Sequence, residues 1–407
     1  MSCFNCQVKV IPLNVSERSS TISYAIRDVV EYARKLELKG DKILKLNIGD
    51  PLKFDFRTPE PMVDAIINAA KSNFNGYEDS LGNTELRRVI AERESKNNGK
   101  IYLEDVVITS GVTEGVNLVF GATLESGDEV LIPGPGYPTY TAYANFFGAV
   151  PISYRTIEEE GWDIDVEDLR SKITDRTRCI VIINPNNPTG ATYSKKNLRE
   201  ILDIALEHDL FVISDEIYDR ITFNDSFVSP ASMTDEVPIL TFNGISKIYL
   251  APGWRVGYIA FYNWDTLSDI KEGIMKELRA RIAANSVCQM GAIEAYKSSE
   301  KYVLEMVSKL KERSEFAYKR LNEIPGISTT KPMGSLYIFP KVELENRWKD
   351  DKEFVYEFLR MKKVLLVHGS GFCPIYGKDH FRSVFLPPVD MMEEAFTRLE
   401  DFMKSKK

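Results

Sequence analysis

One lysine and one arginine near the middle of the chain have the types and the spacing to hold an aldehyde that carries a phosphate group. Lys247 follows an apolar run at residues 238–242 and lies among small residues, and Arg255 follows eight residues later between two glycines. A partly desolvated lysine at a rigid strand end can form an imine, because its amine is neutral enough to attack an aldehyde. An arginine beside glycines can grip a phosphate closely. Together they predict a pyridoxal phosphate site, although a surface lysine and an arginine in a turn explain the stretch more simply when it is taken alone.

Residues with chemical potential also follow the other predicted strands of this region. Apolar runs at 105–110, 129–133, 178–184 and 211–214 alternate with helical segments, which is the pattern of an α/β domain around a mostly parallel sheet. Ligands of such sheets bind outside the carboxyl ends of the strands, so the residues that follow the strands are expected to meet at one edge. The residues that fall at this edge are Ser110, Thr113, Tyr137, Asn187, Asp215, Tyr218, Lys247 and Arg255.

The segment after the first of these runs is suited to binding an anion. Residues 111–115 read Gly-Val-Thr-Glu-Gly and open an apolar pattern of helical period. The free N–H groups and the positive end of the helix dipole at such a turn point at one spot, where they stabilise a phosphate. Ordinary capping of the helix by Thr113 explains the same pattern without a ligand, and both interpretations stay open at this point.

Asp215 and Tyr137 suit a flat ring that contains nitrogen. Asp215 emerges from an apolar strand, where a lone buried carboxylate is costly and needs a partner. A ring nitrogen that becomes protonated would serve, as would an arginine or a helix N-terminus. Tyr137 lies in a loop fixed by glycine and proline residues, so it either stacks on such a ring or packs against the end of the sheet.

Two positions outside this region also have chemical possibilities. Arg382 stands in a β run of apolar neighbours, where a charge usually lies at a solvated edge or forms a clamp for a carboxylate. Gly49 ends an apolar run at 43–48 and precedes Asp50 and Pro51, so the chain must turn there. The glycine either marks the turn only or lets a ligand approach the backbone.

The elements that position these residues divide the chain into two parts. We predict a large α/β domain over residues 51–300, and a smaller α+β domain formed by residues 1–50 together with 301–407. Further strands are expected near residues 258–261, 335–339, 364–367 and 381–386, and helices over 21–39, 58–71, 84–96, 195–207, 301–322 and 351–362.

Composition and charge limit the classes of function. The 407 residues suffice for two domains, and the composition is that of a soluble globular protein. A net charge of −8 and a pI near 5.3 argue against general binding of nucleic acid. No apolar run approaches the ~20 residues of a membrane span, and there is no signal-peptide pattern, so no membrane association and a cytoplasmic location are expected.

The five cysteines do not form a disulfide framework, because their number is odd and their spacing is wide. Cys3 and Cys6 form a C-x-x-C pair, but neither a second such pair nor a pair of histidines accompanies it. Two incidental thiols in an N-terminal tail are therefore favoured over a zinc or redox site, and no metal is expected.

Several stretches taken together carry a resemblance to a known family. The chain resembles the class I aminotransferases of pyridoxal phosphate fold type I over nearly its whole length. The stretches that carry the likeness to the alanine aminotransferase group are SYAIRDVV, NIGDP, NPNNPTG, SDEIYD, NGISK and GWRVGY. The resemblance implies an α/β fold, with a large domain whose mostly parallel central sheet is flanked by helices, and a smaller α+β domain.

The resemblance also implies how the cofactor, pyridoxal 5′-phosphate, is bound. Lys247 would bind it covalently and move a proton between the substrate α-carbon and the cofactor, and Asp215 would keep the pyridine nitrogen protonated. Asn187 and Tyr218 would bind the phenolic oxygen, and Tyr137 would stack on the ring. The residues implied to meet the phosphate are Val112, Thr113, Ser246 and Arg255, with Tyr77 reaching the phosphate of a neighbouring subunit.

The substrate and the assembly follow from the same resemblance. Arg382 would grip the α-carboxylate of the substrate, assisted by Asn187 and the backbone of Gly49. A homodimer with active sites at the subunit interface is expected. One position departs from the wider family, because Gly244 stands where a phosphate-binding serine is common, which puts one phosphate contact in doubt.

The resemblance implies an alanine:2-oxoglutarate (glutamate–pyruvate) aminotransferase that works by a ping-pong mechanism. The alternative is an aspartate or broad-specificity aminotransferase. Relatives specific for dicarboxylates use an extra arginine of the partner subunit for the distal carboxylate, and Arg279 or Arg281 could serve in this way or could be solvated helix charges. A lyase or decarboxylase on the same fold would use the same lysine and aspartate. A regulator with an aminotransferase-like half is disfavoured, because the N-terminal residues offer no basic DNA-binding motif.

Overall fold

The centre of the molecule is an eight-stranded sheet in a computed structural model that describes residues 14–22, 25–224, 227–298, 300–344 and 347–405. The strand order is β2-β9-β8-β7-β6-β3-β4-β5. Pairing is parallel from β8 through β7, β6 and β3 to β4, whereas β9 runs antiparallel to both β2 and β8, and β5 runs antiparallel to β4. The expected mostly parallel sheet is therefore confirmed. The strands are β2 (Val106–Thr109), β3 (Glu129–Gly134), β4 (Val150–Ile157), β5 (Asp163–Ile164), β6 (Thr177–Ile183), β7 (Phe211–Asp215), β8 (Ile239–Gly244) and β9 (Gly257–Tyr262).

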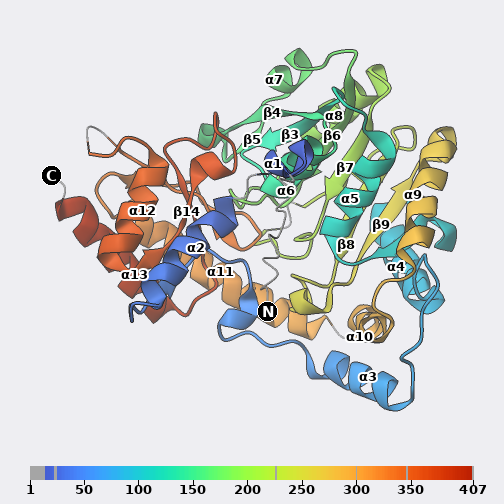
Figure 1. The fold of residues 1–407 in the computed structure, drawn as a ribbon, viewed down its shortest axis with the longest axis horizontal. Coiled ribbons are helices and arrows are strands. Elements are labelled where there is room, and N and C mark those ends of the chain that lie inside the picture. Colours follow the sequence, from blue (N-terminus) through green and yellow to red (C-terminus); the bar gives the residue numbers. More distant parts are fainter. Residues whose placement is uncertain (1–13, 23–24, 225–226, 299, 345–346, 406–407) are drawn as a thin grey trace, which may run out of the picture.

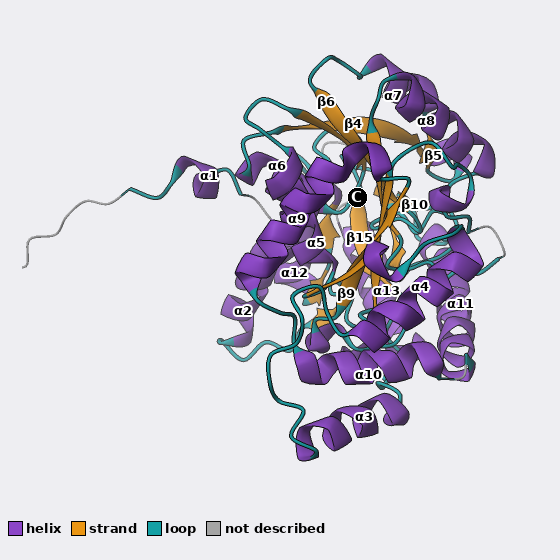
Figure 2. Cartoon of the chain, turned by 90° about the vertical axis from the view of Figure 1, so that its right-hand side faces the viewer, coloured by secondary structure: helices purple, strands orange, loops and turns teal. Residues whose placement is uncertain are grey.

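Helices cover both faces of this sheet, as Figure 2 shows. Because side chains alternate along a strand, β6 sends Ile180 and Ile182 into one apolar cluster and Cys179, Val181 and Ile183 into another. A sheet buried on both faces explains why these strands read as continuous apolar runs in the sequence. The helices of this part are α3 (Glu60–Lys71), α4 (Thr84–Asn98), α5 (Val112–Thr123), α6 (Pro138–Phe146), α7 (Val166–Ser171), α8 (Lys195–Glu207), α9 (Ser268–Arg281) and α10 (Ser286–Lys297).

The two ends of the chain form a second part beside the large sheet (Figure 1). Strand β1 (Leu44–Lys45) pairs in parallel with β13 (Val364–Leu365), and helix α2 (Ala25–Glu37) contacts α12 (Asp351–Lys362). A three-stranded sheet in the order β11-β15-β14 lies in this part. These contacts support the expected joining of the chain ends, while the domain boundaries themselves stay a prediction. The remaining elements are α1 (Glu17–Ser20), α11 (Lys301–Asn322), β10 (Ile327–Ser328), β11 (Tyr337–Ile338), β12 (Lys341–Val342), β14 (Val367–His368), β15 (Phe381–Val384) and α13 (Val389–Ser405).

Two apolar runs of the sequence form shorter strands than their lengths suggest. The run at 43–48 contains only the two-residue strand Leu44–Lys45, because its partner β13 is equally short and the chain then leaves the sheet. The run 364–367 divides between β13 and β14, which belong to different sheets. Several observed elements have no counterpart among the predicted ones, including strands β4 and β5 and helices α6, α7, α9, α10 and α13.

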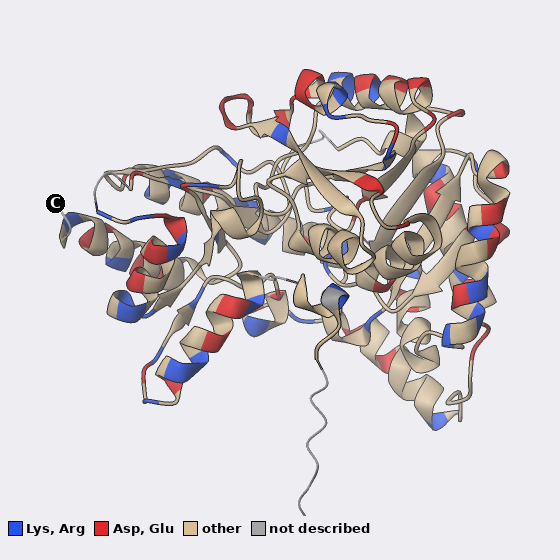
Figure 3. Ribbon diagram, turned by 45° about the horizontal axis from the view of Figure 1, so that its top comes forward, with Lys and Arg blue, Asp and Glu red and all other residues tan. Residues whose placement is uncertain are grey.

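Charged residues of both signs are mixed along the outer helices, and the central strands contain few of them (Figure 3). This distribution agrees with the modest acidic net charge. Among the described helices, none combines the length and the hydropathy that crossing a membrane requires.

Candidate active site

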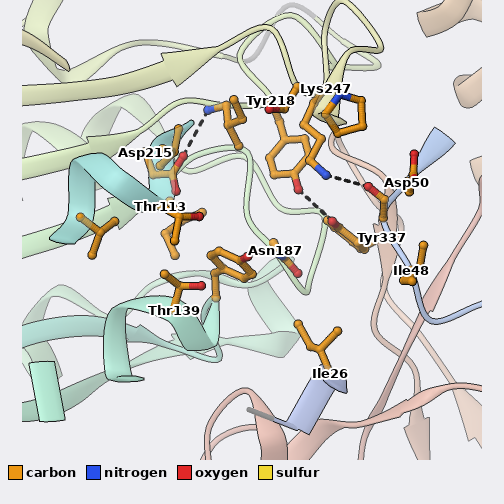
Figure 4. A pocket seen from close by; sticks show the side chains of 18 of the residues that line it. Ile26, Ile48, Asp50, Thr113, Thr139, Asn187, Asp215, Tyr218, Lys247 and Tyr337 are labelled. Atoms are coloured by element: carbon orange, nitrogen blue, oxygen red, sulfur yellow. Dashed lines mark hydrogen bonds between the residues drawn. The ribbon is translucent and has the colours of Figure 1, made fainter. Parts of the chain in front are cut away.

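A cavity of about 630 Å³ opens at the carboxyl edge of the central sheet, where the second part of the chain meets it. Figure 4 shows Asp215, Thr113 and Thr139 on one side of this cavity, Tyr337 and Asp50 on the other, and Lys247 and Tyr218 between them. The structure thus brings together residues that the sequence places far apart. The predicted residues that line the cavity are Gly49, Val112, Thr113, Tyr137, Asn187, Asp215, Tyr218, Ser246, Lys247, Arg255 and Arg382.

One end of the cavity is built to hold an anion. Helix α5 begins at Val112, and its N-cap, Gly111, provides no side-chain hydrogen bond to the first turn. The first N–H groups of the helix are therefore available to a ligand, and Thr113 is not the cap that the alternative interpretation required. Arg255 crosses Gly111 closely and donates from Nη2 to the Ser110 carbonyl at 3.1 Å. A side chain at position 111 would occupy the space of this guanidinium.

Gly244 is explained by its neighbours. A Cβ atom at this position would lie 2.7 Å from the Val256 carbonyl oxygen and 2.8 Å from the Gly257 Cα. Both are backbone atoms of the adjacent strand, so they cannot turn aside. The serine that is common in the wider family has no room here, and the phosphate contact that it would make is absent from this chain.

Asp215 lies at the end of β7 and is 3% exposed. Its Oδ2 accepts a hydrogen bond from the Tyr140 hydroxyl at 2.8 Å, and its Oδ1 accepts one from the Ile217 N–H at 3.3 Å. Burial raises the pKa of the Asp215 carboxyl to about 6, and these two hydrogen bonds and the Lys247 charge oppose the rise. Burial also raises the pKa of Tyr140 well above its usual range, so that its hydroxyl stays a donor. The carboxylate is thus held in place, but the groups around it compensate only part of its negative charge.

The turn after Asp215 is fixed from two directions. The Glu216 N–H donates to the Phe242 carbonyl of the neighbouring strand at 2.8 Å. Asp219 is buried and forms an ion pair with Arg93 of helix α4. These contacts hold Tyr218 over the cavity, where burial raises the pKa of its phenol well above the usual range.

Lys247 follows β8 and extends across the cavity. Its Nζ donates to the Gly49 carbonyl oxygen at 2.6 Å, which joins the large sheet to the N-terminal segment. Gly49 has no room for a side chain, because a Cβ there would overlap the hydroxyl of Tyr337. The sequence left open whether this glycine only marks a turn, and the structure shows a close approach at its backbone.

Arg382 lies in β15 and is 2% exposed. Its Nη1 donates to Asn187 Oδ1 at 2.9 Å and its Nη2 to the Asn47 carbonyl at 2.5 Å. A guanidinium has five N–H donors, and Nε has no partner among the described residues. A buried arginine with unused donors at the edge of a cavity is suited to a carboxylate ligand, so the alternative of a solvated edge is wrong.

Three residues that the sequence analysis considered for the site do not line the cavity, and two cysteines that it considered lie outside the residues that the structure describes. Tyr77 does not line this chain's cavity and is 89% exposed. Arg279 is exposed and pairs with Glu272, and Arg281 donates to the carbonyls of Ser80 and Ile108. Neither arginine lines the cavity of its own chain. Cys3 and Cys6 lie outside the residues that the structure describes.

Several lining residues were not found by sequence reasoning. Arg27 of helix α2 brings another guanidinium to the cavity, and Lys53 lies in the 3-10 turn after Gly49. Tyr140 and Tyr337 contact Asp215 and Tyr218 directly. The available sequence signal for Arg27 was its place beside the apolar Ile26 in the helical pattern of residues 21–39. No local signal marks Tyr337.

The residues present fit pyridoxal phosphate, because an uncapped helix N-terminus, a buried acid, a lysine and an arginine with unused donors share one cavity. A family model for aminotransferases of class I and II matches residues 41–399. The chain belongs to this family, and its cofactor is pyridoxal 5′-phosphate. The fold type expected from the sequence is thereby confirmed.

Three individual relatives are similar to this chain over nearly its whole length. The alanine aminotransferase of Mycobacterium tuberculosis is 39% identical over 400 residues, which cover 96% of this chain and 92% of that protein. The glutamate-pyruvate aminotransferase AlaA of Escherichia coli is 38% identical over 407 residues, which cover 96% and 98%. A solved alanine aminotransferase from Pyrococcus furiosus is similar with a TM-score of 0.94 and 53% identity, over 96% of this chain and 100% of that one.

Proposed function

We propose that this aminotransferase moves the amino group of L-alanine to 2-oxoglutarate by a ping-pong mechanism. The observation that carries the proposal is Arg382, buried with unused donors in the same cavity as Lys247 and Asp215. The names of the relatives from three organisms support the choice of alanine, and two of the three alternatives weighed from the sequence, a lyase and a regulator, find no support in those names.

In this proposal the large sheet holds the cofactor. Lys247 binds it covalently and then moves a proton at the substrate α-carbon. Asp215 would pair with the ring nitrogen. This pairing is favourable because the buried carboxylate is only partly compensated by its protein neighbours, and a protonated nitrogen would supply the missing positive charge. Tyr137 would stack on the ring, and Tyr218 and Asn187 would donate to the phenolic oxygen. The groups that would hold the phosphate are Val112, Thr113, Ser246 and Arg255. When bound, the cofactor supplies a ring that withdraws electrons from the reacting carbon.

The second part of the chain holds the substrate in the same proposal. Arg382 binds the α-carboxylate that every amino acid has, with Asn187 and the Gly49 backbone beside it. Alanine needs no further charge. Glutamate has a second carboxylate, and Arg27 offers it a cation in the same cavity. We therefore assign the distal carboxylate to Arg27, while binding by Arg279 or Arg281 of a partner subunit stays a prediction.

We also propose that the active unit is a homodimer. Tyr77 is 89% exposed in the single chain, which is unusual for an aromatic side chain of a folded protein. A neighbouring subunit would cover it, and it would contribute to the partner's phosphate site. Light scattering measures the assembly, and Tyr77→Phe should weaken cofactor binding without changing the measured mass.

The proposed function is tested by the absorbance spectrum of the purified protein. Addition of L-alanine without an acceptor should bleach the yellow band of the bound cofactor, and 2-oxoglutarate should restore it. Bleaching by aspartate but not by alanine would move the enzyme to the aspartate alternative. Turnover of the amino acid that does not depend on an oxo-acid acceptor would indicate a lyase.

The role of Lys247 is tested separately by Lys247→Ala. The variant should lose transamination, while pyridoxal phosphate still binds through the phosphate site and Asp215. Cofactor content after gel filtration and the absence of a borohydride-reducible link report the two properties. Substantial remaining turnover would show that another group moves the proton.

A further inference from the structure

Tyr337 contacts both Arg382, which is proposed to bind the substrate carboxylate, and Tyr218, which is proposed to bind the phenolic oxygen of the cofactor. It lies in β11, is 3% exposed, and pairs with Val384 of the antiparallel strand β15. Arg382 is two residues before Val384, so both side chains leave β15 on one face. The strand register therefore places the Tyr337 ring diagonally beside Arg382.

The ring of Tyr337 covers one face of the arginine. The Arg382 guanidinium carbon lies 4.5 Å from the centroid of the Tyr337 ring and 4.8 Å from that of Phe372. A cation between two rings in a buried site is stabilised through the ring faces and is held in one plane. The two terminal nitrogens donate to Asn187 and to the Asn47 carbonyl, and the residue lines the cavity, where its remaining N–H groups can bind a carboxylate.

The hydroxyl of Tyr337 contacts Tyr218. The two phenolic oxygens are 2.8 Å apart and both side chains are buried, with their rings nearly perpendicular. Either hydroxyl can donate in isolation. If Tyr218 donates its single hydrogen to the cofactor's phenolic oxygen, as the proposed function requires, the hydrogen between the two tyrosines must come from Tyr337.

The position of this hydroxyl is also fixed from the N-terminal segment. The space beside the Gly49 Cα is filled by the Tyr337 hydroxyl and ring. The same Gly49 carbonyl accepts from Lys247 at 2.6 Å. The Tyr337 side chain is thus enclosed by Gly49, Tyr218 and Arg382, which come from three separate segments of the chain.

We propose that Tyr337 is a positioning residue that orients Arg382 through its ring and directs the hydrogen of Tyr218 towards the cofactor through its hydroxyl. This inference rests on the proposed function. The two actions belong to different atoms of one side chain, so different substitutions separate them. A purely structural role would give one common loss in both variants.

The experiment compares Tyr337→Phe with Tyr337→Leu. Tyr337→Phe keeps the ring and should leave the KM for alanine and for glutamate within about twofold, as expected if the cation–ring contact is intact. The pH midpoint of the cofactor's absorbance band should rise by roughly half a pH unit, because Tyr218 becomes a weaker donor. Tyr337→Leu should shift the midpoint similarly and raise both KM values about tenfold.

Tyr154→Phe is the matched control. Tyr154 is fully buried and donates one hydrogen bond, to the Val181 carbonyl at 2.7 Å, without lining the cavity. Its variant should lose thermal stability with no change in the pH midpoint or in either KM. An unmoved midpoint in Tyr337→Phe, or equal KM values in the Phe and Leu variants, would overturn the inference. Absence of a cofactor band in the unmodified protein would overturn the proposed function, and this inference with it.

Discussion

Replacement of Asp215 by asparagine should stabilise the cofactor-free protein at neutral pH. Burial raises the pKa of this carboxyl from 3.8 to about 6, and one pKa unit corresponds to about 1.4 kcal/mol. Between these values the folded protein keeps a proton that the unfolded chain has released, so stability falls as the pH rises through this window. The ionised carboxylate therefore costs about 3 kcal/mol of unfolding free energy above pH 6.

Asparagine removes the charge but not every contact. Its amide oxygen can accept from Tyr140, whereas its NH₂ group then faces the Ile217 N–H and loses the bond at 3.3 Å. One such hydrogen bond contributes about 1 kcal/mol. The expected net gain of Asp215→Asn at pH 8 is therefore about 2 kcal/mol, and the gain should vanish or reverse at pH 4, where Asp215 is already protonated in the folded state.

The assay is urea unfolding of the cofactor-free protein at pH 4, 6 and 8, at a fixed protein concentration. The control is Asp235→Asn, the same substitution at an exposed position outside the cavity. Addition of pyridoxal phosphate should then stabilise the unmodified protein more than Asp215→Asn, since only the carboxylate pairs with a protonated ring nitrogen. Equal stability of the two proteins at pH 8, or a difference that is constant across the pH range, would refute the reasoning.

Three further substitutions follow from the same geometry. Arg382→Lys should lose a charged hydrogen bond worth about 2 kcal/mol and raise the KM for alanine and glutamate alike; steady-state kinetics that show a change for one substrate only would contradict its assignment to the shared carboxylate. Arg27→Gln should raise the KM for glutamate and 2-oxoglutarate while sparing alanine and pyruvate, and an equal effect on all four would remove Arg27 from distal recognition. Gly244→Ser should lower stability by roughly 1–3 kcal/mol through overpacking against β9; a thermal melt that is unchanged would show that the backbone can yield.

Residues that follow strands of the large sheet could be predicted from the sequence. Asp215, Asn187 and Lys247 each end a local apolar run, and the rule that parallel strands share one carboxyl edge brings them together without further information. The register of β6, β7 and β8 confirms this edge. The signal is local because a buried parallel strand is a continuous apolar run.

Cavity residues that lie in two-residue strands or on helices could not be predicted from the rule for strand ends. Tyr337 belongs to a two-residue strand, and its place depends on a register with β15 that no periodic pattern records. Tyr140 belongs to α6, which packs against β3 and β4, and its hydroxyl reaches Asp215 at the end of β7 across the sheet. Arg279 and Arg281 lie in the last turn of α9, where cations are common, and their sequence position alone did not reveal their partners.

The pairing of Leu44 with Val364 has a consequence for the order in which the molecule is made. Helix α5, Asp215 and Lys247, together with strand β9 that joins β2 to β8, are all present once the chain has been synthesised to residue 262. The end of the cavity proposed to bind the substrate needs residues 47–49 to meet Tyr337 and Arg382. Because Tyr337 and Arg382 are synthesised later and meet segments far away in the chain, the surface proposed to bind the cofactor can form on the ribosome before the proposed substrate end is complete. A nascent chain would thus acquire its reactive lysine first and its substrate selectivity last.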